Sequence, residues 1–500
     1  MSKSVLPEDF RLVVAYSIYS CIYNLYFHPL AHIPGPFWAR ATPIPYILHI
    51  RNGLMVPWVQ KLHKTYGDVI RIAPTEASFI TGESAWQDIY GFRTGKNKSE
   101  SYQKSREWYP VPISGAPSML IADDANHSRM RKNLSHAFSD RALRDQETLV
   151  QDLVNLLVSR LHEEAEAGKD VDIMMWYNYT TFDVITDLTF GEPLGNLRDR
   201  GYHSWVNLVF GNLKAGGIMA MRRKYPMVNY MDNIMGFFTD NSAALRARLE
   251  FGRVTTEKVN QRVDNGTSRP DFFSAVLKNI GNDEKGLSRP EMVSNAILLM
   301  VAGSETTATL LSGATFLILQ NPAVYKKMVN EIRTRFSSAD DITFEEVSKL
   351  DYTIAVLQES LRYYPPVPTG FPRVVPKGGD RISGHYVPEG TSVYVSQHAA
   401  NHSERNWTEP DTFAPERWMK DAPAKYKDDN HASMNAFSFG PRNCLGKNLA
   451  YAEMRLIMAK VLWHFDLEMK PESEGWLERH RLFMLWEKPS LMVKLKPVER

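Results

Sequence analysis

The sequence predicts a mainly α-helical fold with a small β region. Long segments with apolar residues at helical spacing, such as 143–167 and 295–311, account for much of the chain. Segments that alternate as strands do, such as 69–72 and 391–395, are few and short. Hydrophobic residues make up 43% and charged residues 23% of the 500 residues, which is typical of a globular protein with a large core.

The first 30 residues differ from the rest of the chain. The stretch from Leu12 to Phe27 carries no charge, but it is shorter than the roughly 20 residues that span a bilayer core. We expect residues 1–30 to associate with a membrane, either spanning it or lying on it, and a buried N-terminal helix is the alternative. Residues 31–500 are expected to form one domain. Cations that follow the apolar stretch would keep this domain cytoplasmic, namely Arg40, Arg51, Lys61 and Lys64.

Charge and cysteine content exclude two classes of protein. Lys and Arg number 59 against 57 Asp and Glu, so the net charge of +2 provides no overall field for nucleic acid. We therefore expect no nucleic-acid partner. The two cysteines, Cys21 and Cys444, form no disulfide framework and favour a reducing compartment.

The N-terminal half begins with a predicted hairpin of strands 69–72 and 78–81, followed by a stretch without a clear period, 94–117. The next helix carries His127 and Arg131, which are four residues apart and share one face. A surface pair is the alternative interpretation of these two residues. Four further helices are predicted over 143–167, 174–190, 203–223 and 241–264.

A long helix is predicted after Ser288-Arg289-Pro290-Glu291, which has the residue types of a helix start. The run to Leu319 is almost uncharged, and Glu305 is the only charge between residues 295 and 311. A lone carboxylate in such a helix is costly unless it is paired, hydrated or functional.

Thr306 lies four residues after Ala302 and three after Gly303, so the three share a face of this helix. The hydroxyl can compete for a backbone carbonyl and open the helix locally. Together with Glu305, it could hold water and relay protons. A core helix with one capped threonine is the alternative.

The C-terminal half contains a helix with Glu359 and Arg362 at a spacing of three, ended by two prolines, and Arg417 follows about 55 residues later. An exposed pair of this kind contributes only about 0–1 kcal/mol. Residues 391–395 predict a strand, and residues 482–495 predict a hairpin with its turn near Leu485.

Cys444 lies in the segment 437–446, Phe-Ser-Phe-Gly-Pro-Arg-Asn-Cys-Leu-Gly, at the start of a helix predicted over 447–465. Backbone N–H groups and the helix dipole favour negative charge there, so we expect a lowered pKa of the thiol. A shielded thiolate suits an axial haem ligand. For a lone cysteine, a buried structural role is the alternative.

The segment resembles a known signature. Phe437, Gly440, Arg442, Cys444, Gly446 and Ala450 match the haem-binding motif of the cytochrome P450 family, so the chain resembles a haem-thiolate monooxygenase with the cytochrome P450 fold. The resemblance implies haem b as the cofactor and Cys444 as the axial ligand of its iron. It also places Phe437, Gly440, Arg442 and Gly446 around the cofactor.

Other motifs of the family occur in the same order. Ala302 to Thr307 match the oxygen-activation motif, which implies Thr306 as the proton-delivery alcohol and Glu305 as the acid, with Ala302 and Gly303 beside the haem. Glu359, Arg362 and Arg417 match a structural triad. Donors to the haem propionates are implied at His127, Arg131, Arg373 and Arg442. The implied substrate pocket, capped by the stretch 94–117, contains Leu299, Ala302, Thr306, Thr369 and Leu485.

The resemblance also carries expectations about function and location. Residues 23–36 resemble the anchor junction of fungal microsomal members, and residues 181–191 resemble secondary-metabolism members, including hydroxylases of trichothecene and aflatoxin pathways. This implies insertion of one atom of O2 into an apolar polyketide or terpenoid intermediate at the endoplasmic reticulum membrane. Alternatives are a reductase-independent isomerase or dehydratase of the same fold, and a non-catalytic haem sensor.

Electrons are expected from NADPH through a separate cytochrome P450 reductase, with cytochrome b5 as a further partner, because the chain has no flavin or nicotinamide motif. Five cations fall in segments that the family places on the reductase-facing side: Lys132, Arg141, Lys425, Lys427 and Lys447. Scattered surface cations are the alternative interpretation.

Overall fold

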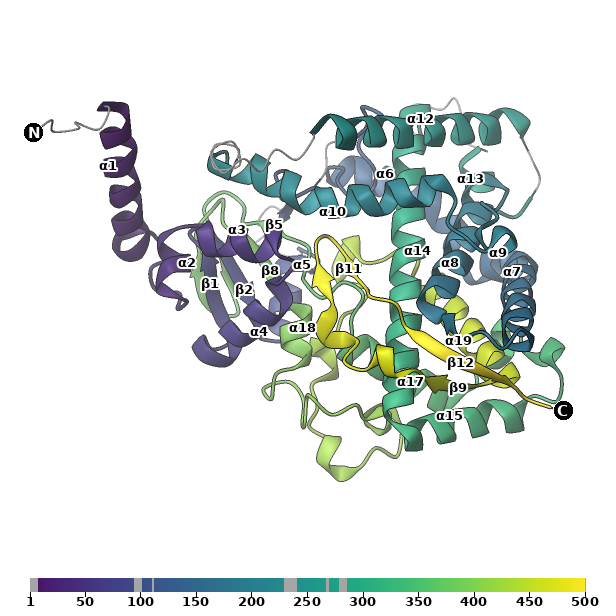
Figure 1. Ribbon diagram of the computed structural model, residues 1–500. Coiled ribbons are helices and arrows are strands. Elements are labelled where there is room, and N and C mark those ends of the chain that lie inside the picture. The colour runs from purple at the N-terminus through teal and green to yellow at the C-terminus, as the bar shows by residue number, and fades with distance from the viewer. Residues whose placement is uncertain are drawn as a thin grey trace, which may run out of the picture.

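The computed structural model describes residues 8–93, 101–109, 112–228, 241–266, 269–277 and 286–499. These residues form a mainly helical protein with small β-sheets, which confirms the predicted fold class (Figure 1). Two parts of the stretch expected to cap the substrate pocket, 94–100 and 110–111, lie outside the described residues.

The described α-helices are α1 (Glu8–Ile22), α2 (Phe37–Ala41), α3 (Ile44–Arg51), α4 (Met55–Tyr66), α5 (Glu83–Tyr90), α6 (Asp124–Ser135), α7 (Asp140–Glu166), α8 (Ile173–Phe190), α9 (Asn196–Asp199), α10 (Ser204–Lys224), α12 (Asn241–Asn265), α13 (Phe272–Leu277), α14 (Arg289–Gln320), α15 (Pro322–Arg335), α16 (Phe344–Val347), α17 (Asp351–Tyr363), α18 (Gln397–Asn401) and α19 (Lys447–His464). Every helix predicted by periodicity is present, with ends that shift by a few residues.

The longest helix, α14, runs through the middle of the molecule (Figure 1). It starts where the sequence predicts, because the hydroxyl of Ser288 and the carboxylate of Glu291 cap each other's backbone N–H groups. Among the described residues, it is the one helix long and apolar enough to cross a membrane, and 67% of its apolar window is buried inside the protein. It is therefore the core helix against which α8, α17 and α19 pack.

The largest sheet contains five strands in the order β1 (Val69–Ala73), β2 (Glu76–Phe79), β8 (Ser392–Val395), β5 (Arg373–Val374) and β3 (Gln103–Lys104). β1 and β2 form the predicted hairpin, and β2 pairs in parallel with β8. β5 pairs with β3 in a register that sets Arg373 opposite Lys104. This pairing brings two cations together across 269 residues of sequence.

Three smaller sheets complete the β region. β12 (Met492–Pro497) lies between β4 (Val171–Asp172) and β9 (Phe465–Met469), and β6 (Asp380–Ile382) pairs with β7 (His385–Val387). β10 (Arg481–Leu482) and β11 (Trp486–Glu487) form the predicted C-terminal hairpin, and residues 483–485 make its turn.

The N-terminal helix α1 projects away from the body of the molecule and continues into a π-helical turn, Tyr23–Phe27 (Figure 1). Its apolar side chains face outward, and Tyr16 is 72% exposed. The alternative of a buried N-terminal helix does not fit this exposure.

Candidate active site

A cavity of about 240 Å³ lies between α14 and the loop that precedes α19. We call it the inner cavity. Leu299, Ala302, Gly303 and Thr306 line it from α14. Phe437, Arg442, Cys444 and Gly446 line it from the other side, so most of the residues that the sequence motifs single out meet here although they are more than 130 residues apart.

The Cys444 loop is held by its own backbone and by α6. The backbone N–H of Cys444 donates to the carbonyl of Phe437 at 2.8 Å. Arg131 donates to the carbonyl of Asn443 at 2.7 Å and to its side-chain Oδ1 at 2.6 Å. Two nitrogens of Arg131 are therefore occupied in positioning the loop, a contact that its spacing from His127 does not reveal.

The motif suggests that Gly440 lies beside the cofactor, but in the structure it packs against α5. Its φ is +74°, and a Cβ atom would come within 2.0 Å of the carbonyl oxygen of Tyr90 at the end of α5. It does not line the inner cavity. The glycine is thus required by packing against α5, whereas Gly446 lines the cavity.

The pKa of the Cys444 thiol is raised, whereas the sequence led us to expect a lowered value. Burial raises the pKa of the thiol, while a hydrogen bond from the Gly446 backbone and the charges of Arg131 and Lys447 lower it. The effect of burial outweighs the hydrogen bond and the nearby cations, because removing water disfavours the charged thiolate.

Cationic side chains gather at one edge of the inner cavity. They are Lys104 from β3, Arg373 from β5 and Arg442 from the Cys444 loop, with His127 from α6 nearby. Burial and the neighbouring Arg442 hold the pKa of His127 at about 4, so this imidazole is neutral at pH 7. Arg373 itself is buried behind the cavity wall and donates to the carbonyl of Tyr102 at 3.0 Å.

These cations have little negative charge to balance them. Asp124 accepts a hydrogen bond from Arg442 at 2.7 Å, and among the described residues no ion pair joins Lys104 or Arg373. Arg373 Nε and Arg442 Nη1 are buried and have no hydrogen-bond partner in the described part of the chain. A ligand with anionic groups at this edge, such as the propionates of haem, fits this donor set.

Lys104 is a residue that sequence reasoning missed. Its ammonium lies 4.7 Å from the ring centre of Phe371 and 5.1 Å from that of Tyr109, and it lines the inner cavity. Burial, together with Arg373 and Arg442, holds the pKa of Lys104 well below its usual range. The stretch around it has no periodicity, and only the pairing of β3 with β5 places it beside Arg373.

Thr306 and Glu305, the two residues of the expected proton relay, face different parts of the protein. Thr306 lines the inner cavity, and its hydroxyl donates to the carbonyl of Ala302 at 2.6 Å, while α14 remains a continuous helix. Glu305 lies on another side of α14, is buried, and pairs with Lys488.

Gly303 also has a packing role. A Cβ atom at this position would come within 2.4 Å of the side chain of Ile185, so α14 and α8 approach closely here. Because Gly303 has no side chain, α8 can pack closely against α14 at this position. Gly303 also lines the inner cavity.

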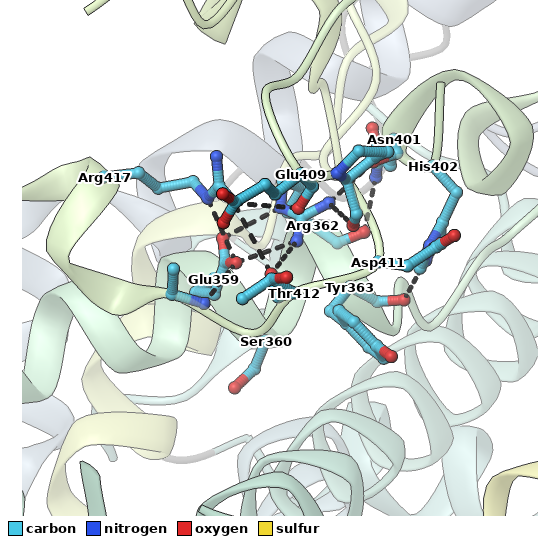
Figure 2. A network of polar contacts seen from close by, with 12 residues as sticks. Glu359, Ser360, Arg362, Tyr363, Asn401, His402, Glu409, Asp411, Thr412 and Arg417 are labelled. Carbon is cyan, nitrogen blue, oxygen red and sulfur yellow. Dashed lines mark hydrogen bonds and ion pairs between the residues drawn. The ribbon is translucent and has the colours of Figure 1, made fainter. Parts of the chain in front are cut away.

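Glu359, Arg362 and Arg417 meet in a fully buried network (Figure 2). Arg362 binds Glu359 through two hydrogen bonds of 2.8 and 2.9 Å, and Arg417 adds a third at 3.1 Å. Arg362 also donates to the carbonyls of Asn401 and Pro410. The side chains of Glu359 and Arg362 are 0% exposed. Their contact is therefore a buried ion pair, and not the weakly stabilising exposed pair that the spacing alone allowed.

A second cavity of about 280 Å³, the outer cavity, adjoins the inner one. Both are lined by Leu120, Leu298, Val367 and Phe371, so the two cavities share an apolar wall. Thr369 lines the outer cavity. Leu485 lines neither, because the hairpin turn presents Phe483 and Met484 to the outer cavity instead.

Comparison with known proteins gives a family match over most of the chain. The family model for cytochrome P450 matches residues 38–495. The chain is 47% identical to the cytochrome P450 monooxygenase traB of Penicillium crustosum over 493 residues, which cover 98% of this chain and 96% of that protein. It is 44% identical to the cytochrome P450 monooxygenase lcsI of Purpureocillium lilacinum, with 98% and 94% covered.

Proposed function

Because this chain belongs to the cytochrome P450 family and is a haem-thiolate monooxygenase, we propose that it inserts one oxygen atom of O2 into a fungal secondary metabolite. The proposed substrate is an apolar small molecule such as a polyketide or terpenoid intermediate, and the reaction is a hydroxylation or an epoxidation.

One observation carries this proposal. Cys444 and Thr306 lie on opposite sides of the inner cavity, which adjoins an outer cavity with mainly apolar walls. A thiol on one side and a hydroxyl on the other are what a haem-dependent oxygenation needs from the protein. The adjoining cavity gives an apolar substrate room beside the site of reaction.

The residues around the inner cavity fit haem b. When bound, the haem supplies the iron that activates O2. Cys444 would bind its iron, and Phe437, Gly446, Ala302 and Gly303 would lie beside it. His127, Lys104, Arg373 and Arg442 would hold its propionates, whereas Arg131 positions the cysteine loop.

Proton supply is assigned to α14. The Thr306 hydroxyl, at the cavity wall, passes protons toward the reacting oxygen, and Glu305 is the acid that replenishes them through water. The Glu359 network has a structural role, since it fixes the segments at residues 401–417 that lead to the Cys444 loop.

Electrons come from a redox partner, for which we propose NADPH-cytochrome P450 reductase, with cytochrome b5 as a second donor. The exposed apolar surface of α1 supports attachment to the endoplasmic reticulum membrane with the catalytic domain in the cytoplasm. Lys425 and Lys447 are among the cations proposed to attract the acidic reductase.

The absorption spectrum of the reduced, carbon-monoxide-bound protein tests the proposal. We expect a long-wavelength Soret band in the wild type and its loss in Cys444→His, because the band requires a thiolate ligand. A well-folded wild type that shows only a short-wavelength band would contradict the proposed function.

A further inference from the structure

Glu305 and Thr306 are neighbours in sequence but face different parts of the protein. Successive residues of an α-helix are about 100° apart around its axis. Thr306 therefore reaches the inner cavity while the Glu305 side chain, 3% exposed, lies against the C-terminal segment. There its carboxylate forms an ion pair with the ammonium of Lys488.

Lys488 is buried as deeply as Glu305 and has a second partner on the same helix. Its Nζ donates to Oγ1 of Thr309 at 2.8 Å, one turn beyond Glu305 on α14. A buried pair of charges is stable only when both charges and their hydrogen bonds are satisfied. The lysine thus joins two successive turns of α14 to the segment between β11 and β12.

The pairing leaves the two oxygens of Glu305 in different states. Oε1 contacts Lys488 and lies 3.5 Å from Oγ1 of Thr309. Oε2 is buried and has no hydrogen-bond partner in the part of the chain that the structure describes. The carboxylate therefore has one oxygen held by Lys488 and one buried oxygen without a hydrogen-bond partner among the described residues.

The position of Lys488 is set by the hairpin before it. Trp486, two residues earlier, stacks on Tyr364 with 5.4 Å between ring centres. Its indole N–H donates to the carbonyl of Pro365 at 2.9 Å. The anchored indole fixes the backbone from which Lys488 projects, and the side chain itself is held by Glu305 and Thr309.

We propose that Lys488 is a positioning residue for oxygen chemistry in this enzyme: it fixes Oε1 of Glu305, so that proton uptake and release occur at Oε2. This inference rests on the proposed function. In each transfer, Glu305 takes one proton from water and releases one through water toward the Thr306 hydroxyl, so its charge and its pairing with Lys488 are restored.

The test uses full-length, haem-loaded protein with NADPH and cytochrome P450 reductase, and O2 itself is the probe. The rate of O2 consumption per haem is measured in H2O and in D2O. We expect Lys488→Met to lower this rate about tenfold and to raise the solvent isotope effect, because proton supply becomes limiting. Lys488→Arg, which keeps the charge, should recover most of the rate.

Lys496→Met is the matched control. Lys496 also forms an ion pair, with Glu468, but both side chains are more than half exposed. We expect this variant to match the wild type. A Lys488→Met variant with a normal carbon-monoxide band, rate and isotope effect would overturn the proposal.

Thr309→Val provides the same test where Lys488→Met fails to bind haem. It retains both charges and removes the hydroxyl that accepts from Lys488 and lies 3.5 Å from Oε1 of Glu305. We expect a smaller loss of rate with the same rise in the isotope effect, and an unchanged isotope effect would overturn the inference. Failure of the wild type itself to consume O2 with the reductase would instead contradict the proposed function.

Discussion

At the scale of single residues, the chemistry of each functional side chain depends on what surrounds it. Cys444 stands at a helix start, yet burial raises the pKa of its thiol. Lys104 is a lysine among aromatic rings and cations, and burial holds its pKa well below the usual range. In both cases the loss of water around the charged form is the largest cause of the pKa shift.

Lys104→Met should weaken haem retention. A charge-assisted hydrogen bond contributes about 1.5–3 kcal/mol, so we expect haem loss to accelerate by roughly tenfold or more. Transfer of haem to excess apomyoglobin measures this rate. Lys132→Met, which removes an exposed lysine of α6, is the control, and equal rates for the two variants would contradict the assignment.

Thr306→Ala should separate electron use from product formation. The substitution removes the hydroxyl at the cavity wall, so we expect hydrogen peroxide release per NADPH to rise several-fold while haem binding is retained. Peroxide and NADPH are measured together in the reductase-coupled assay. Thr315→Ala on the same helix, buried away from the cavity, is the control. An unchanged peroxide yield would remove Thr306 from the relay.

Glu453→Gln should change how stability depends on pH. Burial raises the pKa of Glu453 from 4.5 to about 8, against a hydrogen bond from Thr307 that lowers it. The folded wild type therefore keeps a proton that the unfolded chain releases, and its stability falls by about 1.4 kcal/mol per pH unit between these values. We expect Glu453→Gln to be more stable than the wild type at pH 8 and similar at pH 5. Urea unfolding at the two pH values measures this, and parallel pH dependences would contradict it.

At the scale of elements, the C-terminal half is organised by contacts that cross between helix and loop. α17 supplies Glu359 and Arg362, and the turn at residues 415–418 supplies Arg417 (Figure 2). The indole N–H of Trp418, in the same turn, donates to Glu359 at 2.9 Å. Arg417 also pairs with buried Asp429. Because every donor is satisfied without water, the network holds its segments in one arrangement.

Glu359→Ala should be strongly destabilising. Removing one partner of a buried ion pair leaves uncompensated charge and typically costs about 3–5 kcal/mol. We expect loss of bound haem and of cooperative unfolding, measured by the carbon-monoxide band and by urea titration. Glu345→Ala, in the exposed pair with Lys349, should change stability by less than about 0.5 kcal/mol. A full haem complement in Glu359→Ala would contradict the structural role.

At the scale of the whole molecule, one side carries an unusual exposed apolar surface. It consists of α1, the π-helical turn, α2 and α3, with side chains that include Tyr16, Tyr26, Phe27 and Trp38. In Figure 1 these elements lie together at one end, beside the five-stranded sheet. An exposed apolar surface of this kind marks a membrane or protein contact.

Replacing Tyr16 and Tyr19 of α1 by aspartate should release the protein from membranes. Both side chains are exposed, and charged groups are unfavourable among lipid chains. We expect the fraction that sediments with phospholipid vesicles to fall several-fold while the carbon-monoxide band is unchanged. Tyr386→Asp, which alters an exposed tyrosine on β7, should have no effect. Equal sedimentation of both variants would contradict membrane attachment through α1.

The sequence by itself determined the fold class, the order of the helices, the capped start of α14 and the motifs around Cys444 and Thr306. These features are local, because periodicity reports which face of an element is buried and a motif reports residues a few positions apart. The largest helices and the hairpin of β1 and β2 were accordingly predicted within a few residues.

Only the tertiary structure decided which distant groups meet. Lys104 pairs opposite Arg373, Lys488 binds Glu305 across 183 residues, and Glu359 is fully buried where its spacing alone allowed an exposed pair. The turn likewise presents Met484 rather than Leu485 to the outer cavity. The physical reason is that burial, charge compensation and register arise from packing between elements, and one element's sequence does not specify its partner.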